Sequence, residues 1–367
     1  MKISFCIIAM NRLNHLMQTL EDNLKECCRD DDVEIVLLDY NSKDNMESWV
    51  KNAFETMIAN GKLIYFKTFD PVSFNHSHSK NLAFKLSNGD IVCNINADHY
   101  LGNGFVDYIR KQFNNNSNIV LTPLNIYDDN NDFLIPGDTG GKVCVRKENF
   151  IQIKGFDEKM NIYGFEDVDF INRLTFVGVN PFRITEPQFL SFIHHSDVDR
   201  HSSNTILAQI ENIFIHYITP FVSRILIIYK NGTFEMGDII DNIVKASFNY
   251  KSAYSSKKTF LFAKKSKSWR KGSWSFEEEE LKLTFLRSNQ TLQLISKNDF
   301  LVSRVDQEHY YRANPTLMAE IAAFNYVHFN RTLFLKNKRN KLGIVNHKSF
   351  GSGLVYKNFD YSTPIKI

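Results

Sequence analysis

The first half of the chain alternates short runs of β-branched residues with amphipathic stretches, and this alternation restricts the fold more than any other feature. The strand-like runs are Ser4 to Ile8, Glu34 to Asp39, Leu63 to Phe66 and Ile91 to Ile95. The helix-like segments are Arg12 to Cys27, Ser77 to Leu86 and Phe105 to Phe113. Strands that alternate with helices predict an α/β fold with a mostly parallel sheet flanked by helices.

The ends of these strands are the first candidates for a binding site. Open sheets of this kind bind ligands at the carboxyl ends of their strands. The strand ends lie at Ala9 to Arg12, Asp39 to Ser42 and Asn96 to His99. The helix after the first strand shows leucines at helical spacing, and Asn11 is placed to cap it.

The second half has a different character. The chain has 367 residues, more than one typical domain, and the pattern changes beyond about His195. Two or three helices are predicted between Asn204 and Tyr250, followed by a basic, Ser-rich stretch. Strand-like runs then cover Leu281 to Leu286, Thr291 to Ile295 and Phe300 to Val305, before a helix from Asn314-Pro315 to about Phe329. We expect a sheet-based domain over 1–200, a helical segment over 201–257 and a C-terminal α+β extension over 258–367.

Charge and apolar content exclude some classes of protein. A formal net charge of +3 gives no reason to expect a nucleic-acid partner. Five cysteines without a framework spacing, and a start without a cleavable signal pattern, predict a reducing, cytoplasmic setting. The longest apolar stretch, Ile210 to Tyr229, is broken by His216, Pro220 and Arg224, which argues against a membrane span. We interpret it as a packed helical hairpin, with an interfacial helix at the inner face of the membrane as the alternative.

The apolar strand that begins at Ile91 ends in the polar run Asn96-Ala97-Asp98-His99. A carboxylate at such a strand end can bind a divalent cation, which in turn holds a diphosphate. An aspartate that ends a strand is also a common turn former. On this run alone, both interpretations of Asp98 stay open.

A second acidic cluster contains Glu166, Asp167 and Asp169. Acidic side chains are favoured at helix N-termini, so the cluster fits the first turn of a helix. In the functional interpretation, one carboxylate, held ionised by the positive helix end, acts as a general base on a hydroxyl. The two interpretations are compatible.

The histidines form two groups. His194 and His195 end a strand-like run, and an imidazole joined to Asp98 on a metal would favour Mn²⁺, with Mg²⁺ as the alternative ion. His76 and His78 lie two residues apart on a predicted helix, so they point to different sides and do not share an ion easily.

Six segments then follow one another in a recognisable order. They are Ile8 to Leu16, Phe74-Asn75-His76 with Asn81 to Phe84, Asn96-Ala97-Asp98, Gly140-Gly141-Lys142 with Gly155-Phe156-Asp157, Tyr163 to Asp169 with Asn172-Arg173-Leu174, and Ile193 to Ser196. In this order they resemble the GT-A glycosyltransferases of the family 2 type and, more closely, the catalytic core of the β1,4-galactosyltransferases. The resemblance covers about the first two hundred residues and implies a GT-A fold.

The resemblance also implies a role for each matched position. Asp167 would be the general base, and Glu166 would help to hold the acceptor. Asp98 and His195 would bind the metal, with His194 as the alternative to His195. The donor would contact Ala9, Asn11, Arg12, Asp39, His76, Asn96, Ala97, Gly141 and Tyr163, with Arg12 and Asp39 on the uridine side.

Three positions depart from the pattern of these families. Asn96 stands at the first acidic position of the DxD motif and brings no charge. Tyr163 replaces the tryptophan that closes over the donor. His76 replaces the arginine of the Phe-Asn-Arg segment.

The implied reaction is an inverting, metal-dependent transfer of a sugar from a UDP-sugar to a hydroxyl of a glycan. The sugar would be of the galactose, GalNAc or GlcNAc class, and the product a surface polysaccharide or glycoconjugate. The alternative is a catalytically inactive homologue that binds glycan or nucleotide. Asn96 is the residue that favours it. A nucleotidyltransferase is disfavoured because Ile7 to Asn11 contains no Gly-rich phosphate loop. The C-terminal extension would bind acceptor or mediate assembly, and the oligomeric state stays open.

Overall fold

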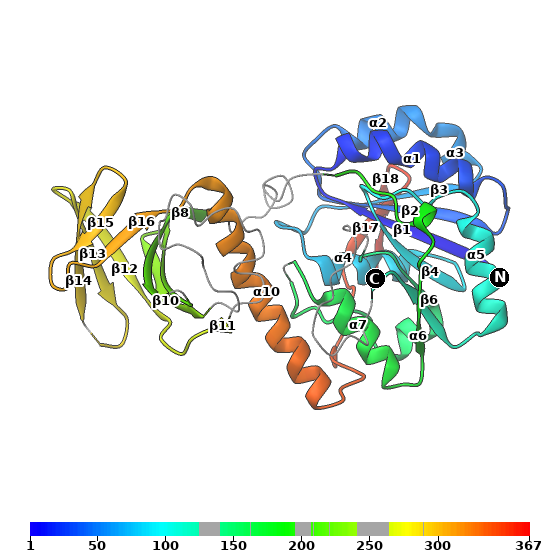
Figure 1. Cartoon of the computed structure of the whole chain (residues 1–367). Helices are drawn as coiled ribbons and strands as arrows, with labels where there is room; N and C mark the ends of the chain where they lie inside the picture. The colour runs from blue at the N-terminus through cyan, green and yellow to red at the C-terminus, as the bar shows by residue number, and fades with distance from the viewer. Residues whose placement is uncertain are drawn as a thin grey trace. The chain divides into compact units, whose positions relative to one another are not determined.

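The structure of the protein is a computed structural model that describes residues 1–124, 140–161, 163–194, 207, 209–219, 221–240, 264–288 and 290–367. The chain forms two compact units (Figure 1). The first unit contains Met1–His194 together with Asn330–Ile367, and the second contains His195–Phe329. Each unit has its own sheet.

The first unit is built on a nine-stranded sheet with the order β18-β17-β3-β2-β1-β4-β6-β5-β7 (Figure 1). Its strands are β1 (Ile3–Ala9), β2 (Val33–Tyr40), β3 (Leu63–Thr68), β4 (Ile91–Asn96), β5 (Ile119–Thr122), β6 (Val143–Arg146), β7 (Asn180–Arg183), β17 (Leu354–Lys357) and β18 (Asp360–Lys366). β1 pairs in parallel with β2 and β4, and β2 pairs in parallel with β3. β6 runs antiparallel between β4 and β5. The four strands predicted in the first half are confirmed.

Helices cover both faces of this sheet. They are α1 (Leu13–Cys27), α2 (Met46–Ala53), α3 (Glu55–Ala59), α4 (His76–Leu86), α5 (Phe105–Asn115), α6 (Lys147–Gln152) and α7 (Glu166–Thr175), with a short 3-10 helix η1 (Pro187–Phe189). Phe5 and Ile7 of β1 pack with α1 and α5 on one face, whereas Cys6 and Ile8 pack with α4 and α7 on the other. β1 is apolar throughout because both of its faces are buried. The predicted fold class, a mostly parallel sheet flanked by helices, is confirmed.

The end of the chain completes the first unit. α10 (Pro315–Arg339) begins at Pro315 as predicted but runs on to Arg339, and its part from Asn330 belongs to this unit. β17 pairs antiparallel with β3, and Phe334 and Val355 are buried in the same core as α4. The prediction of one C-terminal extension over 258–367 is therefore wrong, because Asn330–Ile367 extends the first sheet.

The second unit is a closed antiparallel sheet. Its strands are β8 (Ile210–Thr219), β9 (Val222–Tyr229), β10 (Thr233–Ile240), β11 (Lys264–Lys265), β12 (Arg270–Glu277), β13 (Glu280–Phe285), β14 (Thr291–Lys297), β15 (Phe300–Ser303) and β16 (His309–Arg312). The order β10-β12-β13-β14-β15-β16-β8-β9 returns to β10, because β9 and β10 also pair. The strand-like runs predicted from Leu281 to Val305 are confirmed.

The prediction of a helical segment over 201–257 is wrong for the residues that the structure describes there. Ile210 to Tyr229 forms the antiparallel hairpin of β8 and β9, and is neither a helical hairpin nor an interfacial helix. Phe214 points to one side of β8 while Ile213 and Ile215 point to the other, and all three are buried. A strand buried on both faces is a continuous apolar run, which periodicity does not distinguish from a buried helix.

Membrane contact was the other alternative for this stretch. Across the described residues, the structure contains no helix with the length and apolar character needed to cross a membrane.

Candidate active site

The carboxyl ends of β1, β2 and β4 meet at one edge of the first sheet. Ala9 is level with Asp39 of β2, and Ile8 is level with Asn96 of β4. β2 and β4 flank β1 on opposite sides, so the strand order reverses at β1, where open α/β sheets bind ligands. The structure therefore brings Ala9, Asp39 and Asn96 together.

Asp39 is fully buried, and three groups hold its carboxylate. The Ser42 backbone N–H donates to Oδ1 at 2.7 Å, and the Tyr65 hydroxyl donates to Oδ2 at 2.7 Å. Lys67 Nζ lies 3.2 Å from Oδ2. Burial, and then the charge of Asp39, raise the pKa of Tyr65, so the hydroxyl stays a donor. Asp39 thus shapes the turn after β2, and its contact to uridine stays a prediction.

The turn after β1 contains a left-handed residue, Asn11, with φ 56°. Its side-chain oxygen accepts a hydrogen bond from the Lys43 backbone N–H at 2.6 Å. Arg12 is the N-cap residue of α1, and Asp44 accepts from the Leu13 backbone N–H at 2.9 Å. The prediction that Asn11 caps this helix is wrong, because its side chain binds the neighbouring turn instead. Asn11 is exposed and Arg12 half-buried.

Gly141 packs directly against the side chain of Asn96. A Cβ atom added to Gly141 would lie 2.8 Å from Asn96 Oδ1, so any larger residue would displace this amide. Asn94 Nδ2 donates to Asn96 Oδ1 at 3.2 Å and to the Gly141 carbonyl at 2.6 Å. Asn96 is therefore held in place as an uncharged group at the end of β4.

Asp98 follows the buried Ala97 just beyond β4, and it is itself 9% exposed. Its carbonyl accepts from the Ile193 backbone N–H at 2.8 Å, so the strand-like run toward the histidines passes beside it. His194 is exposed, and His195 lies outside the described residues. Within the part of the chain that the structure describes, no group of three or more His, Cys, Asp or Glu side chains is arranged to hold a metal ion.

Glu166 and Asp167 occupy the first turn of α7. Two residues with positive φ, Gly164 at 99° and Phe165 at 67°, turn the chain into this helix. The Gly164 carbonyl accepts from Asn330 Nδ2 at 2.8 Å, which fixes the turn. The interpretation of this acidic cluster as a helix N-terminus is confirmed, and the helix dipole favours negative charge there.

Both carboxylates are bound by one lysine of α4. Lys80 Nζ donates to Asp167 Oδ1 at 2.7 Å and to Glu166 Oε1 at 3.2 Å. His76, one turn earlier, places Nδ1 3.8 Å from Glu166 Oε1. The side chains of Lys80 and Glu166 are each 6% exposed, whereas that of Asp167 is 14% exposed. Asp167 is thus the more accessible of the two carboxylates.

Burial opposes charge on both sides of this cluster, but the neighbouring charges outweigh it. Burial acts to raise the pKa of Glu166, yet Lys80 and His76 lower that pKa below its ordinary value of 4.5. Burial acts to lower the pKa of Lys80, yet Asp167 and Glu166 raise that pKa above 10.5. Glu166 and Lys80 are therefore both charged at neutral pH.

His76 connects α4 with the segment before α7. Its ring centre lies 5.6 Å from that of Tyr163 and 4.6 Å from that of Phe74, both in edge-to-face geometry. His78 points elsewhere, with Nδ1 2.7 Å from the Tyr40 hydroxyl. The prediction that His76 and His78 face different sides is confirmed.

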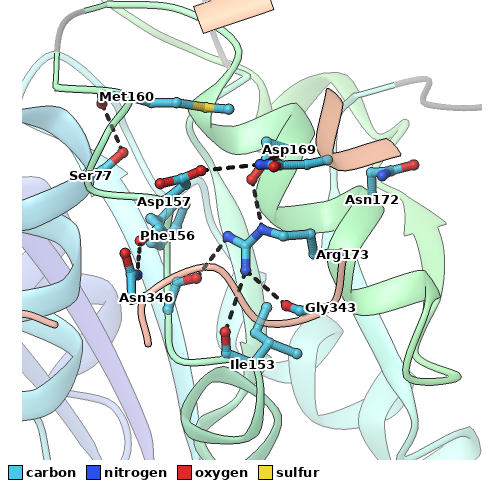
Figure 2. Close-up of polar contacts among 12 residues, drawn as sticks. Ser77, Ile153, Phe156, Asp157, Met160, Asp169, Asn172, Arg173, Gly343 and Asn346 are labelled. Atoms are coloured by element: carbon cyan, nitrogen blue, oxygen red, sulfur yellow. Dashed lines mark hydrogen bonds and ion pairs between the residues drawn. The ribbon is translucent and has the colours of Figure 1, made fainter. Parts of the chain in front are cut away.

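A buried network of hydrogen bonds around Asp169 and Arg173 fixes α7 in place (Figure 2). Arg173 Nε donates to Asp169 Oδ2 at 2.7 Å, and neither side chain is exposed. The other guanidinium nitrogens reach the carbonyls of Ile153, Gly155 and Gly343. Asn337 Nδ2 donates to Asp169 Oδ1 at 2.9 Å and to Asp157 Oδ2 at 3.1 Å. Asp169, the third acidic residue of the cluster, therefore has a structural role.

None of the sequence motifs points to Lys80. The available signal was its position four residues after His76 in a predicted helix, which places the two on one face. Its partners became visible only when the fold brought α4 against α7.

Residues 129–196 match the model of the Glyco_transf_7C family, described as the N-terminal domain of galactosyltransferase. This segment contains Gly141, Tyr163, Glu166, Asp167 and both candidate metal-binding histidines. No curated protein matches the sequence.

Several solved structures are similar at low identity. They include the mannosyltransferase PcManGT from Pyrobaculum calidifontis in complex with GDP-Man and Mn²⁺, which is 16% identical with a TM-score of 0.45 over 55% of this chain and 61% of that one. TarS of S. aureus in complex with UDP is 16% identical, with a TM-score of 0.41 over 50% of this chain and 59% of that one. The catalytic domain of Drosophila β1,4-galactosyltransferase 7 in complex with xylobiose is 19% identical, with a TM-score of 0.35 over 53% and 71%. The chain spans about three fifths of the length of the first two.

The family match and the fold lead to one conclusion. The matched segment carries the acidic turn of α7, and the sheet of this unit contains the order β3-β2-β1-β4. Residues 129–196 are similar to the N-terminal domain of galactosyltransferase, and the unit that contains most of them has an α/β fold with a mostly parallel sheet flanked by helices.

Proposed function

We propose that this protein transfers a sugar from a UDP-sugar to a hydroxyl of a glycan with inversion at the anomeric carbon. One observation carries the proposal: the carboxylates of Glu166 and Asp167 lie together at the start of α7, bound to Lys80. Glu166 Oε2 is buried and has no hydrogen-bond partner within the described part of the chain. A buried carboxylate oxygen without a donor is costly, so Glu166 retains the capacity to accept one further hydrogen bond.

In this mechanism Asp167 is the general base. It takes the proton of the attacking hydroxyl while the oxygen bonds to the anomeric carbon and the bond from that carbon to the diphosphate oxygen breaks. The attack comes from the side opposite the diphosphate, which inverts the configuration. Glu166 helps to hold the acceptor, and the more accessible Asp167 takes the proton.

The donor would lie along the strand ends at Ala9, Asn11, Arg12, Asp39, Asn96 and Ala97, with His76, Gly141 and Tyr163 beside it. Asp98 and His195, or His194 in its place, would hold a divalent cation. The residues fit such a site because Asp98 stands at the strand end and the backbone leading to the histidines bonds to it. A carboxylate with an imidazole suits Mn²⁺ better than Mg²⁺. When bound, the cation neutralises the departing diphosphate.

The experiment is a screen of UDP-Gal, UDP-GalNAc and UDP-GlcNAc, each with Mn²⁺, for thermal stabilisation and slow donor hydrolysis. GDP-Man is the control for the nucleobase of the donor. Stabilisation and hydrolysis with a UDP-sugar are expected. The anomeric configuration of a transferred product, read by NMR, should be opposite to that of the donor. Absence of any shift with every UDP-sugar would contradict the proposal.

We extend the proposal to a cytoplasmic enzyme of surface polysaccharide or glycoconjugate synthesis.

The competing function is a homologue that binds without turnover. Asn96 favours it, because an amide replaces a carboxylate at the strand end and is locked there by Asn94 and Gly141. Stabilisation by a UDP-sugar without hydrolysis or transfer to any glycan acceptor would support this alternative.

A further inference from the structure

Lys80 is a buried cation that packing alone does not require. It lies in the middle of α4, and its neighbours Leu82, Ala83 and Phe84 fill the core with apolar side chains. The centre of the apolar Phe156 ring lies 5.2 Å from Nζ. Burying an ammonium costs free energy unless charged partners compensate, and an apolar residue in its place would avoid that cost.

The compensation comes from the two carboxylates that the proposed reaction uses. One ammonium donates to Asp167 Oδ1 at 2.7 Å and to Glu166 Oε1 at 3.2 Å. The lysine bonds to one oxygen of each carboxylate, and Oε2 of Glu166 has no hydrogen-bond partner among the described residues. The lysine therefore sets the direction of the carboxylates as well as their charge.

We propose that Lys80 is a positioning residue of the transfer reaction, which fixes the orientation and the ionised state of Asp167 and Glu166 in the free enzyme. This inference rests on the proposed function. Lys80 does not touch the reacting atoms in this scheme. It acts through Asp167, the group that receives the proton.

Titratable groups of α4 and α7 meet in this cluster. α4 contributes Lys80 and His76, and α7 contributes Glu166 and Asp167. Tyr163, before α7, contacts the His76 ring. His76 reinforces Lys80 when it is protonated, but at 3.8 Å from Glu166 it is the weaker partner.

The sign of the pH effect follows from this arrangement. Lys80 lowers the pKa of Glu166, so the carboxylate keeps its charge as the pH falls through the ordinary value of 4.5. Without the lysine, its positive charge no longer opposes the effect of burial, and the pKa of Glu166 rises. The carboxylate cluster then takes up protons at a higher pH, and the acidic limb of the pH profile of kcat should move upward.

The test compares Lys80→Met with Lys85→Met, which changes a lysine of the same helix that instead donates to the Phe350 carbonyl. Lys80→Met should lower kcat by about tenfold to a hundredfold, because a general base contributes at least that much when it is well placed. Its acidic limb should move up by about one pH unit or more, while the KM for donor stays within about twofold. Lys85→Met should keep the wild-type kcat and acidic limb.

Lys80→Met leaves Glu166 buried without its cation, so a second pair of variants guards against misfolding. Glu166→Gln and the double variant Lys80→Met/Glu166→Gln differ only in the lysine and bury no uncompensated glutamate. The double variant should be about tenfold slower than Glu166→Gln, since Asp167 loses its positioning partner.

Three results would overturn the inference. A wild-type kcat and acidic limb in Lys80→Met would show that the lysine is only structural. A raised KM for donor with unchanged kcat would make Lys80 a donor ligand instead. Equal rates for Glu166→Gln and the double variant would remove the link to Asp167. Failure of the wild-type enzyme to transfer from any UDP-sugar contradicts the proposed function, whereas transfer by the wild type that is unaffected in Lys80→Met contradicts this inference alone.

Discussion

At the scale of single residues, the two carboxylates of the candidate site differ in their surroundings. Glu166 and Asp167 are adjacent in sequence and share Lys80, but Asp167 is the more accessible and Glu166 has the unsatisfied oxygen. An accessible carboxylate suits proton transfer to and from a bound hydroxyl. A buried one suits a fixed hydrogen bond, because it pays a large penalty when its partner is missing.

Asp167→Asn should therefore lower kcat by about a hundredfold or more, because an amide does not accept the proton. The amide oxygen still accepts from Lys80, so the fold and UDP binding should be retained. Steady-state kinetics with calorimetric titration of UDP measure both quantities. Full turnover by Asp167→Asn would remove the proposed mechanism.

Asp98→Ala should weaken Mn²⁺-dependent UDP binding by about tenfold or more, because the carboxylate at the strand end is lost. UDP affinity measured without metal serves as the control and should change little. His195→Ala should raise the Mn²⁺ concentration that binding requires. An unchanged metal titration in that variant would assign the role to His194 or to neither histidine.

At the scale of elements, α7 is held in place by charges that are far from solvent. Arg173 binds Asp169 and three backbone carbonyls (Figure 2). Asn337 of α10 donates a hydrogen bond to the same aspartate. Because these contacts fix the helix, its first turn presents Glu166 and Asp167 to α4 in one position. The precision of the site thus depends on a network that takes no part in the chemistry.

Arg173→Met should destabilise the first unit by about 3–5 kcal/mol, because it leaves the buried carboxylate of Asp169 without its cation. Arg146→Met is the matched control, since its partner Glu148 is largely exposed and such pairs contribute at most about 1 kcal/mol. Urea unfolding followed by circular dichroism measures the difference. Similar unfolding midpoints for the two variants would contradict the structural role of the network.

The elements also show what the sequence could predict. β1 to β4 were predictable because helices with a clear apolar face stand between them, so strand and helix patterns contrast. β8 and β9 were not, because Ile213, Phe214 and Ile215 are all buried and the period of two disappears. Motif residues such as Gly141 and Asp167 were found by their order along the chain. Lys80 was not, since its role depends on contacts across 86 and 87 positions of sequence.

At the scale of the whole molecule, the first unit is discontinuous in sequence. Its sheet begins with the first residues and is completed by β17 and β18 after the second unit has been traversed (Figure 1). β17 covers the edge of β3 and buries Val355 in the core that contains α4.

Deletion of residues 354–367 should therefore lower the melting temperature of the first unit by about 5 °C or more. Burial of a side chain such as Val355 contributes about 1.5–3 kcal/mol, and each kcal/mol corresponds to about 2–4 °C in a unit of this size. Lys366→Ala, at an exposed position of β18, is the control. Differential scanning calorimetry checks the result, and an unchanged transition would show that the hairpin is dispensable.

The same discontinuity sets an order of events during synthesis. Asn337, Gly343 and Asn346 contact α7 and the segment before it, and they emerge from the ribosome after the whole second unit. The closed sheet of His195–Phe329 can form while the first unit still lacks these partners. The acidic turn that carries Glu166 and Asp167 thus acquires its final support only after Asn346 has been made, so the site is completed later than the whole second unit.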